Sequence, residues 1–216
     1  MSFLADNFPL LRDAFLTTLA LTVVSGLLAL VLGTVLVAMR VSPVVALRGL
    51  ATFYVETFRN TPLTVVFFFL AFGIVQIDLQ FPSRFITAVA ALSLYTAAFV
   101  CEALRSGINA VPPGQAEAAR ALGLDFRQSL TTVVLPQAFR TVVPPLGNVW
   151  IALAKNTSIA AGFAVTDLTA TLQRLANANA DQLVLVFAAV VVGYLIITLP
   201  SAWGIRVLER RLAVLR

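Results

Sequence analysis

The sequence contains no histidine, and this absence removes several kinds of enzyme from consideration. Without histidine there is no Ser-His pair for nucleophilic catalysis and no imidazole ligand for a metal ion. The apolar stretches also lack the pair of aspartates that an intramembrane aspartyl protease needs. We therefore predict that the chain is not an enzyme and binds no metal.

Cysteine and lysine each occur once. Cys101 has no partner for an internal disulfide and lies in an apolar stretch, so we interpret it as a packing residue. The only lysine, Lys155, does not belong to a GxxxxGK[ST] motif, and no such motif occurs elsewhere in the chain. The chain therefore cannot hold ATP by a P-loop, and we predict no cofactor for it.

Charged residues are scarce. They make up 12% of the 216 residues, whereas 60% are hydrophobic, and the mean hydropathy is +0.95. These values lie far outside the range of water-soluble domains and predict an integral membrane protein. The first ten residues contain no Lys or Arg, so they lack the basic region of a secretory signal peptide. We expect the first long apolar segment to remain in the mature protein.

The apolar runs predict an all-α membrane protein with five transmembrane helices. Two uncharged runs, 14–39 and 182–205, are each long enough to cross a hydrocarbon core of about 30 Å. Three shorter runs complete the set, and we treat residues 1–216 as a single transmembrane domain. The five spans are expected at about 14–39, 49–75, 84–105, 139–163 and 182–206, with a polar segment at 106–137 between the third and the fourth.

The distribution of basic residues predicts the orientation of the chain. Ten of the fifteen fall on one side of the five spans, and by the positive-inside rule this side faces the cytoplasm. The N-terminus is then outside and the C-terminus inside, and the net charge of +5 reflects topology instead of nucleic-acid binding. The ten residues are Arg40, Arg48, Arg105, Arg120, Arg127, Arg140, Arg206, Arg210, Arg211 and Arg216.

The polar segment 106–137 contains a short predicted helix. Residues 115–122 are good helix formers, and Gly123 is placed to end the helix. Ala118, Ala119 and Leu122 give this helix a small apolar face, which is suited to insertion into a groove of a partner protein. The same pattern also fits a surface helix that lies on its own bundle, and periodicity alone does not decide between the two.

At this point the residues resemble a known family. Glu117-Ala118-Ala119, followed by Gly123 and then by Val133 and Leu135-Pro136, is similar to the EAA signature of ABC importer permeases, with Val133 in place of the usual isoleucine. Other stretches resemble the polar amino acid branch of that family. Two of them, at 106–109 and 155–160, are similar to glutamate permease subunits of actinobacteria. These stretches are RNTPL at 59–63, YTAAF at 95–99, SGIN at 106–109, PPLGN at 144–148 and KNTSIA at 155–160.

The resemblance implies the type I ABC importer permease architecture and an ATP-driven importer of polar amino acids, with glutamate expected, in the bacterial inner membrane. It also implies three kinds of partner: an extracellular substrate-binding protein, a second and non-identical permease chain, and a dimer of ATP-binding subunits that holds ATP and Mg²⁺. In such proteins the EAA segment docks on the ATPase. The predicted contact residues are Glu117, Ala118, Ala119, Leu122 and Gly123.

The ionisable residues inside the predicted spans are candidates for the substrate site, because charges there cost roughly 2.5 to 3.5 kcal/mol each on insertion scales. Arg59 lies roughly 15 Å into a helix entered near residue 49, and Lys155 reaches a similar depth if its helix starts near residue 144. Pro62 has no amide proton and should break the helix beside Arg59. An acidic substrate would be balanced by one of these cations. The substrate-binding candidates are Arg59, Asn60, Thr61, Lys155, Asn156, Thr157 and Ser158.

Several alternatives remain open. Glu56 could pair with Arg59 or cap Asn60 on the same helix, and Glu102 could pair with Arg105. The amino acid carried could instead be glutamine, arginine or histidine, and the substrate site could lie in this chain or in its partner. A self-sufficient secondary carrier is a weaker alternative, because the sequence shows no internal repeat.

Overall fold

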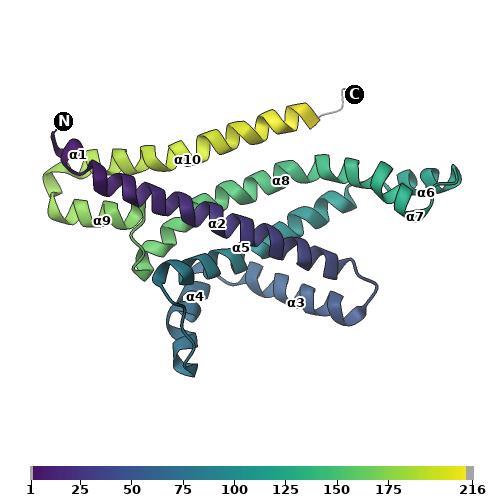
Figure 1. Ribbon diagram of the computed structural model, residues 1–216, viewed down its shortest axis with the longest axis horizontal. Coiled ribbons are helices and arrows are strands. Elements are labelled where there is room, and N and C mark those ends of the chain that lie inside the picture. The colour runs from purple at the N-terminus through teal and green to yellow at the C-terminus, as the bar shows by residue number, and fades with distance from the viewer. Residues whose placement is uncertain (1, 213–216) are drawn as a thin grey trace.

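Three long helices dominate the structure, a computed structural model that describes residues 2–212. They are α2 (Phe8–Arg40), α5 (Arg84–Asn109) and α10 (Leu183–Leu212). All three are long and apolar enough to cross a membrane. Figure 1 shows them extended along the long axis of the molecule. The described residues contain no strand, which agrees with the all-α prediction.

A sharp bend divides the second predicted span. Helix α3 (Val45–Asn60) is followed by the segment Leu63–Ile77, and the two are bent by 106°. Between them Thr61 and Pro62 have extended backbone angles, as expected where a proline removes the helical hydrogen bond to the fourth residue before it. The helix is therefore broken at the predicted place. In Figure 1 the second half projects away from the long helices.

The projecting segment contains three short elements, and none of them is a long regular helix. These are α4 (Leu63–Phe68), the π-helical turn η1 (Phe69–Gly73) and the 3₁₀ turn η2 (Ile74–Ile77). Phe67 in α4 is fully buried and stacks on Phe163 with ring centroids 4.8 Å apart. This contact helps to hold the projecting segment against the rest of the bundle.

The fourth predicted span, 139–163, is followed by a bend. Helix α8 (Leu135–Asn156) passes into the 3₁₀ helix η4 (Thr157–Phe163), and α9 (Leu168–Ala178) follows at an angle of 52°. Counting each bent pair as one span brings the number of candidate spans to five.

The remaining short elements lie near the ends of the long helices. We call the two ends of the molecule the α6 end and the α9 end, after the helices that mark them in Figure 1. Arg216, one of the ten basic residues used to predict orientation, lies outside the described residues. The short elements are α1 (Ser2–Asp6), α6 (Pro113–Ala121), α7 (Phe126–Gln128), the π-helical η3 (Ser129–Val134) and η5 (Ala180–Gln182).

Helix α5 is the centre of the bundle. In its most apolar stretch 61% of the residues are buried, compared with 39% for α2 and 28% for α10. The helices approach closely where small residues meet, because a Cβ built on Gly33 of α2 would lie 2.5 Å from a Val100 methyl carbon of α5. Gly26 faces the ring of Trp150 in the same way. Trp150 is therefore a packing residue at this helix contact.

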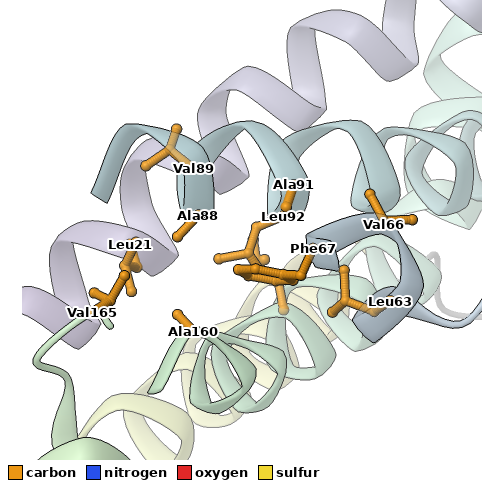
Figure 2. Packing of buried hydrophobic residues seen from close by; sticks show 11 residues of the cluster. Leu21, Leu63, Val66, Phe67, Ala88, Val89, Ala91, Leu92, Ala160 and Val165 are labelled. Atoms are coloured by element: carbon orange, nitrogen blue, oxygen red, sulfur yellow. The ribbon is translucent and has the colours of Figure 1, made fainter. Parts of the chain in front are cut away.

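The largest buried cluster joins segments that are far apart in the sequence. Figure 2 shows Phe67 and Leu92 lying against each other, with Leu21 and Ala160 nearby. Because these residues come from α2, α4, α5 and η4, the cluster fixes the projecting segment and the end of α8 relative to the central helix. This packing also sets the positions of Arg59 and Asn156, which precede the cluster residues Leu63 and Ala160 by four residues in the chain.

Candidate functional site

A hairpin at the α6 end contains the predicted coupling residues. Helix α6 ends at Gly123, whose φ of +85° lies in the left-handed region. The Gly123 amide donates to the Arg120 carbonyl at 2.9 Å, and the Leu124 amide donates to the Ala119 carbonyl at 3.2 Å. This pair of bonds is the Schellman motif, which glycine adopts without the strain that a Cβ would add. The prediction that Gly123 ends the helix is confirmed.

The next turn of the hairpin is closed by a capping box. The Asp125 carboxylate accepts from the Gln128 amide at 2.8 Å, and the Gln128 side chain accepts from the Asp125 amide at 3.0 Å. Between the two caps the chain turns sharply and presents Leu122 and Phe126, which are 84% and 78% exposed. Figure 1 places this turn beyond the ends of the long helices.

The two interpretations of the polar segment each describe one face of α6. Ala119 is 4% exposed and packs within the hairpin, as a helix lying on its own bundle would. Glu117, Ala118 and Leu122 are exposed, as a helix that inserts into a partner would be. Phe126 was not among the predicted residues. An apolar residue directly after the N-cap Asp125 in a polar segment is the signal that identifies it.

Arg59 lies in a cluster of charged side chains around one carboxylate. Glu102 of α5 forms an ion pair with Arg40 from the end of α2, and its second oxygen accepts from Arg105 at 2.9 Å. The Arg59 guanidinium, from the last turn of α3, lies 3.6 Å from the first oxygen. We call these four residues the Glu102 cluster. It joins three helices and contains two more positive charges than negative ones.

The predicted local pairs are only partly found. Glu102 pairs with Arg105 at the expected spacing. Within the part of the chain that the structure describes, Arg59 forms its ion pair with Glu102 and none with Glu56. Asn60 instead donates its side-chain amide to the Glu56 carbonyl at 2.8 Å. The reason is the long Arg59 side chain, which can reach across to α5, whereas sequence spacing describes only neighbours on one helix.

A groove of about 330 Å³ lies between α5 and α8. It contains one of the predicted substrate residues, Asn156, together with a second amide, Asn148. Tyr95 and Phe99 line the α5 side with ring centroids 5.0 Å apart. The groove is lined by Tyr95, Thr96, Phe99, Asn148, Val149, Ala152, Leu153 and Asn156, none of which is charged.

The groove and the Glu102 cluster share one face of α5. Tyr95, Phe99 and Glu102 are separated by four and then three residues, which places them in a row along the helix. Glu102 is one turn from Phe99, or about 4.5 Å of helical rise, toward the α6 end. An uncharged groove with two amides therefore leads directly to a group of three arginines.

Comparisons with known proteins identify the family of the chain. Residues 29–214 match the model of the family described as "Binding-protein-dependent transport system inner membrane component". The chain belongs to this family. It is a transport subunit embedded in a membrane, and the family resemblance of its EAA segment is confirmed.

Individual relatives match over nearly the whole permease. The chain is 45% identical to the "Glutamate transport system permease protein GluC" of Corynebacterium efficiens, over 97% of each chain. It is 38% identical to the "Probable glutamine ABC transporter permease protein GlnM" of Bacillus subtilis, over 98% of this chain and 97% of that protein. A solved structure described as an amino acid ABC transporter with histidines matches with a TM-score of 0.89 and 29% identity, over 96% of each chain.

Most of the remaining substrate candidates in the permease form hydrogen bonds with the backbone of their own helix turn. Thr61 and Ser158 donate their hydroxyl protons to the carbonyls of Thr57 and Lys155, and Thr157, which is buried, donates to Ala154. Each of these hydroxyls is bonded to its own helix turn. Among the predicted seven, the structure brings only Asn156 into the groove and only Arg59 into the Glu102 cluster.

The depth predicted for Lys155 depended on a helix start that the structure does not have. Pro144 and Pro145 lie inside α8, which begins at Leu135. Lys155 is therefore twenty residues, or about 30 Å of rise, from the start of its helix instead of about half that distance. The physical reason is that the capping box and η3 start the helix before the prolines. Lys155 is exposed near the end of α8.

A second buried carboxylate lies at the α9 end. Asp167 caps α9 by accepting from the Ala170 amide at 2.8 Å and is fully buried. Tyr194 of α10 donates to its other oxygen at 3.4 Å, and the next amide, that of Leu168, donates to the Thr18 hydroxyl of α2 at 3.1 Å. Burial raises the pKa of Asp167 to about 6. These contacts fasten α9 to two long helices.

Proposed function

We propose that this permease carries an acidic amino acid, glutamate, into a bacterial cell. The observation that supports this substrate is the Glu102 cluster, whose excess of two positive charges lies at the end of an uncharged, amide-lined groove. A side-chain carboxylate in the groove would be balanced by Arg59, and Asn148 and Asn156 offer hydrogen bonds to the rest of the molecule. The 45% identity to a glutamate permease supports the same substrate.

The proposed assembly follows from the family and from the α6 hairpin. Residues 1–216 form one transmembrane permease domain of the bacterial inner membrane, paired with a second, non-identical permease chain. An extracellular binding protein delivers the substrate. A dimer of ATP-binding subunits, which holds ATP and Mg²⁺, docks on Leu122, Phe126 and the exposed side of α6, because an exposed apolar tip between two rigid caps suits a groove in a partner.

The proposed membrane topology has five spans, with the N-terminus outside and the α6 end in the cytoplasm. Single cysteines at Gln115 of α6 and Gln173 of α9 test it, because both positions are exposed and Cys101 is buried. A membrane-impermeant maleimide should label the cysteine at 173 in intact cells and the one at 115 only after permeabilisation. Labelling of both from outside would contradict the topology.

The substrate is tested by uptake in cells that lack the gene. We expect radiolabelled glutamate uptake to be lost on deletion and restored by the wild-type chain, and only unlabelled acidic amino acids should compete. Competition by glutamine would favour the amide as substrate, which Asn148 and Asn156 also suit. Block by arginine or histidine, or uptake without any ATP-binding subunit, would overturn the glutamate proposal or the importer itself.

Coupling to the ATPase is tested at Gly123. A Cβ added at Gly123 meets no atom within 4 Å, so the effect of Gly123→Val is expected from the positive φ and the loss of the Schellman turn. We expect loss of uptake with continued ATP hydrolysis. Gly123→Asn should retain most uptake, because Asn tolerates this backbone conformation. Gly114→Ala is the matched control, since the same helix has open space there and an ordinary backbone.

A further inference from the structure

One carboxylate in the Glu102 cluster is shared unequally among three arginines. Arg40 and Arg105 hold Glu102 closely, the first as a buried ion pair and the second at 2.9 Å. Arg59 is farther away, at 3.6 Å, and its side chain is the most exposed of the three at 44%. Ion pairs that are longer and more exposed are weaker, so Arg59 is the partner that separates from Glu102 most easily.

Arg59 also lies beside the break in its helix. Arg59 belongs to the last turn of α3, two residues before the extended break at Thr61. The helix direction changes by 106° across that break, and Pro62 cannot restore the helical hydrogen bond. Arg40 and Arg105, by contrast, project from long helices that pack against each other. The weakest ion pair of the cluster is therefore the one formed beside a break in the helix.

The place where a substrate carboxylate would meet Arg59 is next to Glu102. Tyr95 and Phe99 line the groove, and Glu102 continues their row on α5 by one further turn. A carboxylate that reaches the Phe99 end of the groove would therefore approach the same guanidinium that Glu102 holds. Two carboxylates beside one arginine compete for it, because the two negative charges repel each other.

We propose that Glu102 is a resident competitor for the substrate carboxylate: it holds Arg59 while the groove is empty, yields it to the bound substrate and takes it back as the substrate leaves. This inference rests on the proposed acidic substrate. Glu102 is a positioning residue that acts through Arg59. It weakens substrate binding in the groove, and the same competition speeds release toward the α6 end.

The test is equilibrium binding of radiolabelled glutamate to the purified complex of permease chains and ATPase subunits, without the binding protein, together with the maximal uptake rate of the same complex in proteoliposomes. Removing the competitor with Glu102→Gln should tighten binding about fivefold, the value of an ion pair of roughly 1 kcal/mol, and should lower the maximal uptake rate. A purely structural role would weaken both.

Two further variants make the result specific to Arg59. In an Arg59→Gln background, Glu102→Gln should no longer tighten binding, because the arginine for which the two carboxylates compete is absent. This double-mutant cycle isolates the interaction between Glu102 and Arg59. Arg105→Gln is the matched control, since it removes another contact to Glu102 and leaves the competition intact. Arg105→Gln should therefore not show the combination of tighter glutamate binding and slower uptake that is expected for Glu102→Gln. Glu102→Asp, which keeps the charge, should restore wild-type behaviour in part.

The outcomes separate this inference from the proposed function. If the wild-type complex neither binds nor transports glutamate, the proposed substrate is wrong. If it does both and Glu102→Gln leaves the affinity unchanged or weakens it, the competitor role is wrong while glutamate transport stands. Tightening of equal size in the Arg59→Gln background would also overturn the inference, because Glu102 would then act on the substrate without Arg59.

Discussion

The two buried carboxylates of the permease, Glu102 and Asp167, are held in opposite ways. Glu102 faces three guanidiniums from three helices and remains partly exposed, with 19% of its side chain accessible. Asp167 is fully buried, and its partners are neutral groups: the Ala170 amide and the Tyr194 hydroxyl. One site is built from charges that can be exchanged. The other is built from a helix cap that has a fixed geometry.

This difference indicates a role in transport for Glu102 and a purely structural role for Asp167. Exchange of partners keeps Arg59 beside a carboxylate, because a substrate carboxylate can replace Glu102 there while Glu102 keeps Arg40 and Arg105. At Asp167 any movement would leave the first amides of α9 without an acceptor. We therefore expect substitutions around Glu102 to change transport and stability together, and substitutions around Asp167 to change stability and its pH dependence alone.

The largest effect on stability is expected from Arg40→Met. Arg40 is the most buried arginine of the cluster, with 14% of its side chain exposed, and its loss leaves a partly buried carboxylate with weaker compensation. We expect a loss of about 2 to 3 kcal/mol, seen as a lower thermal midpoint of the purified complex at neutral pH. Arg48→Met is the control, because Arg48 is exposed and should contribute under about 0.5 kcal/mol. Equal effects would show that the cluster is not a buried ionic site.

Asp167→Asn tests whether this carboxylate makes stability depend on pH. Because burial raises the pKa of Asp167 to about 6, ionising it in the folded protein costs stability. Its contribution is most favourable below the ordinary aspartate range, declines as the pH rises from about 4 to about 6 by roughly 1.4 kcal/mol for each unit of the pKa difference, and is constant above that. Asn keeps the cap, so the variant should lose this pH dependence.

The pH prediction is measured as the thermal midpoint of the complex between pH 4.5 and 7. Asp181→Asn, at an exposed position before α10, serves as the control and should follow the wild type. The same slope in wild type and Asp167→Asn would show that Asp167 does not titrate in this range. Glutamate uptake at neutral pH should be close to that of the wild type in both variants.

The smallest effect is expected from Tyr194→Phe. The Tyr194 hydroxyl donates to Asp167 at 3.4 Å and lies 2.8 Å from the Thr169 hydroxyl, so its removal should cost about 1 kcal/mol. Losing this donor also destabilises the ionised carboxylate. The pKa of Asp167 should therefore rise, and the decline in the thermal midpoint should extend to higher pH. A shift to lower pH would contradict the role given to Tyr194.

The sequence was sufficient to predict features that depend on neighbours along the chain. The break at Pro62, the glycine that ends α6 and the pairing of Glu102 with Arg105 all follow from local backbone or i,i+3 rules. Hydropathy likewise predicted the long helices. The match to the permease family confirmed the family that the EAA segment resembles.

Features that depend on contacts between distant segments were not predictable in the same way. The ion pair between Arg59 and Glu102 joins α3 to α5, and the groove brings Asn148 beside Tyr95. The sequence offered only local partners for these residues. Likewise, the depth given to Lys155 depended on a helix start near residue 144, whereas α8 continues through both prolines, which a membrane helix tolerates when neighbouring helices pack around it.

The proposed role of Arg59 is to balance the carboxylate of an acidic substrate. Its most direct test is ATP-dependent glutamate uptake by the purified complex in proteoliposomes, with the same binding protein added to wild type, Arg59→Gln and Arg59→Lys. We predict that Arg59→Gln lowers uptake about tenfold or more while ATP hydrolysis without substrate is unchanged, and that Arg59→Lys recovers part of the uptake. Unchanged glutamate uptake in Arg59→Gln would contradict the account.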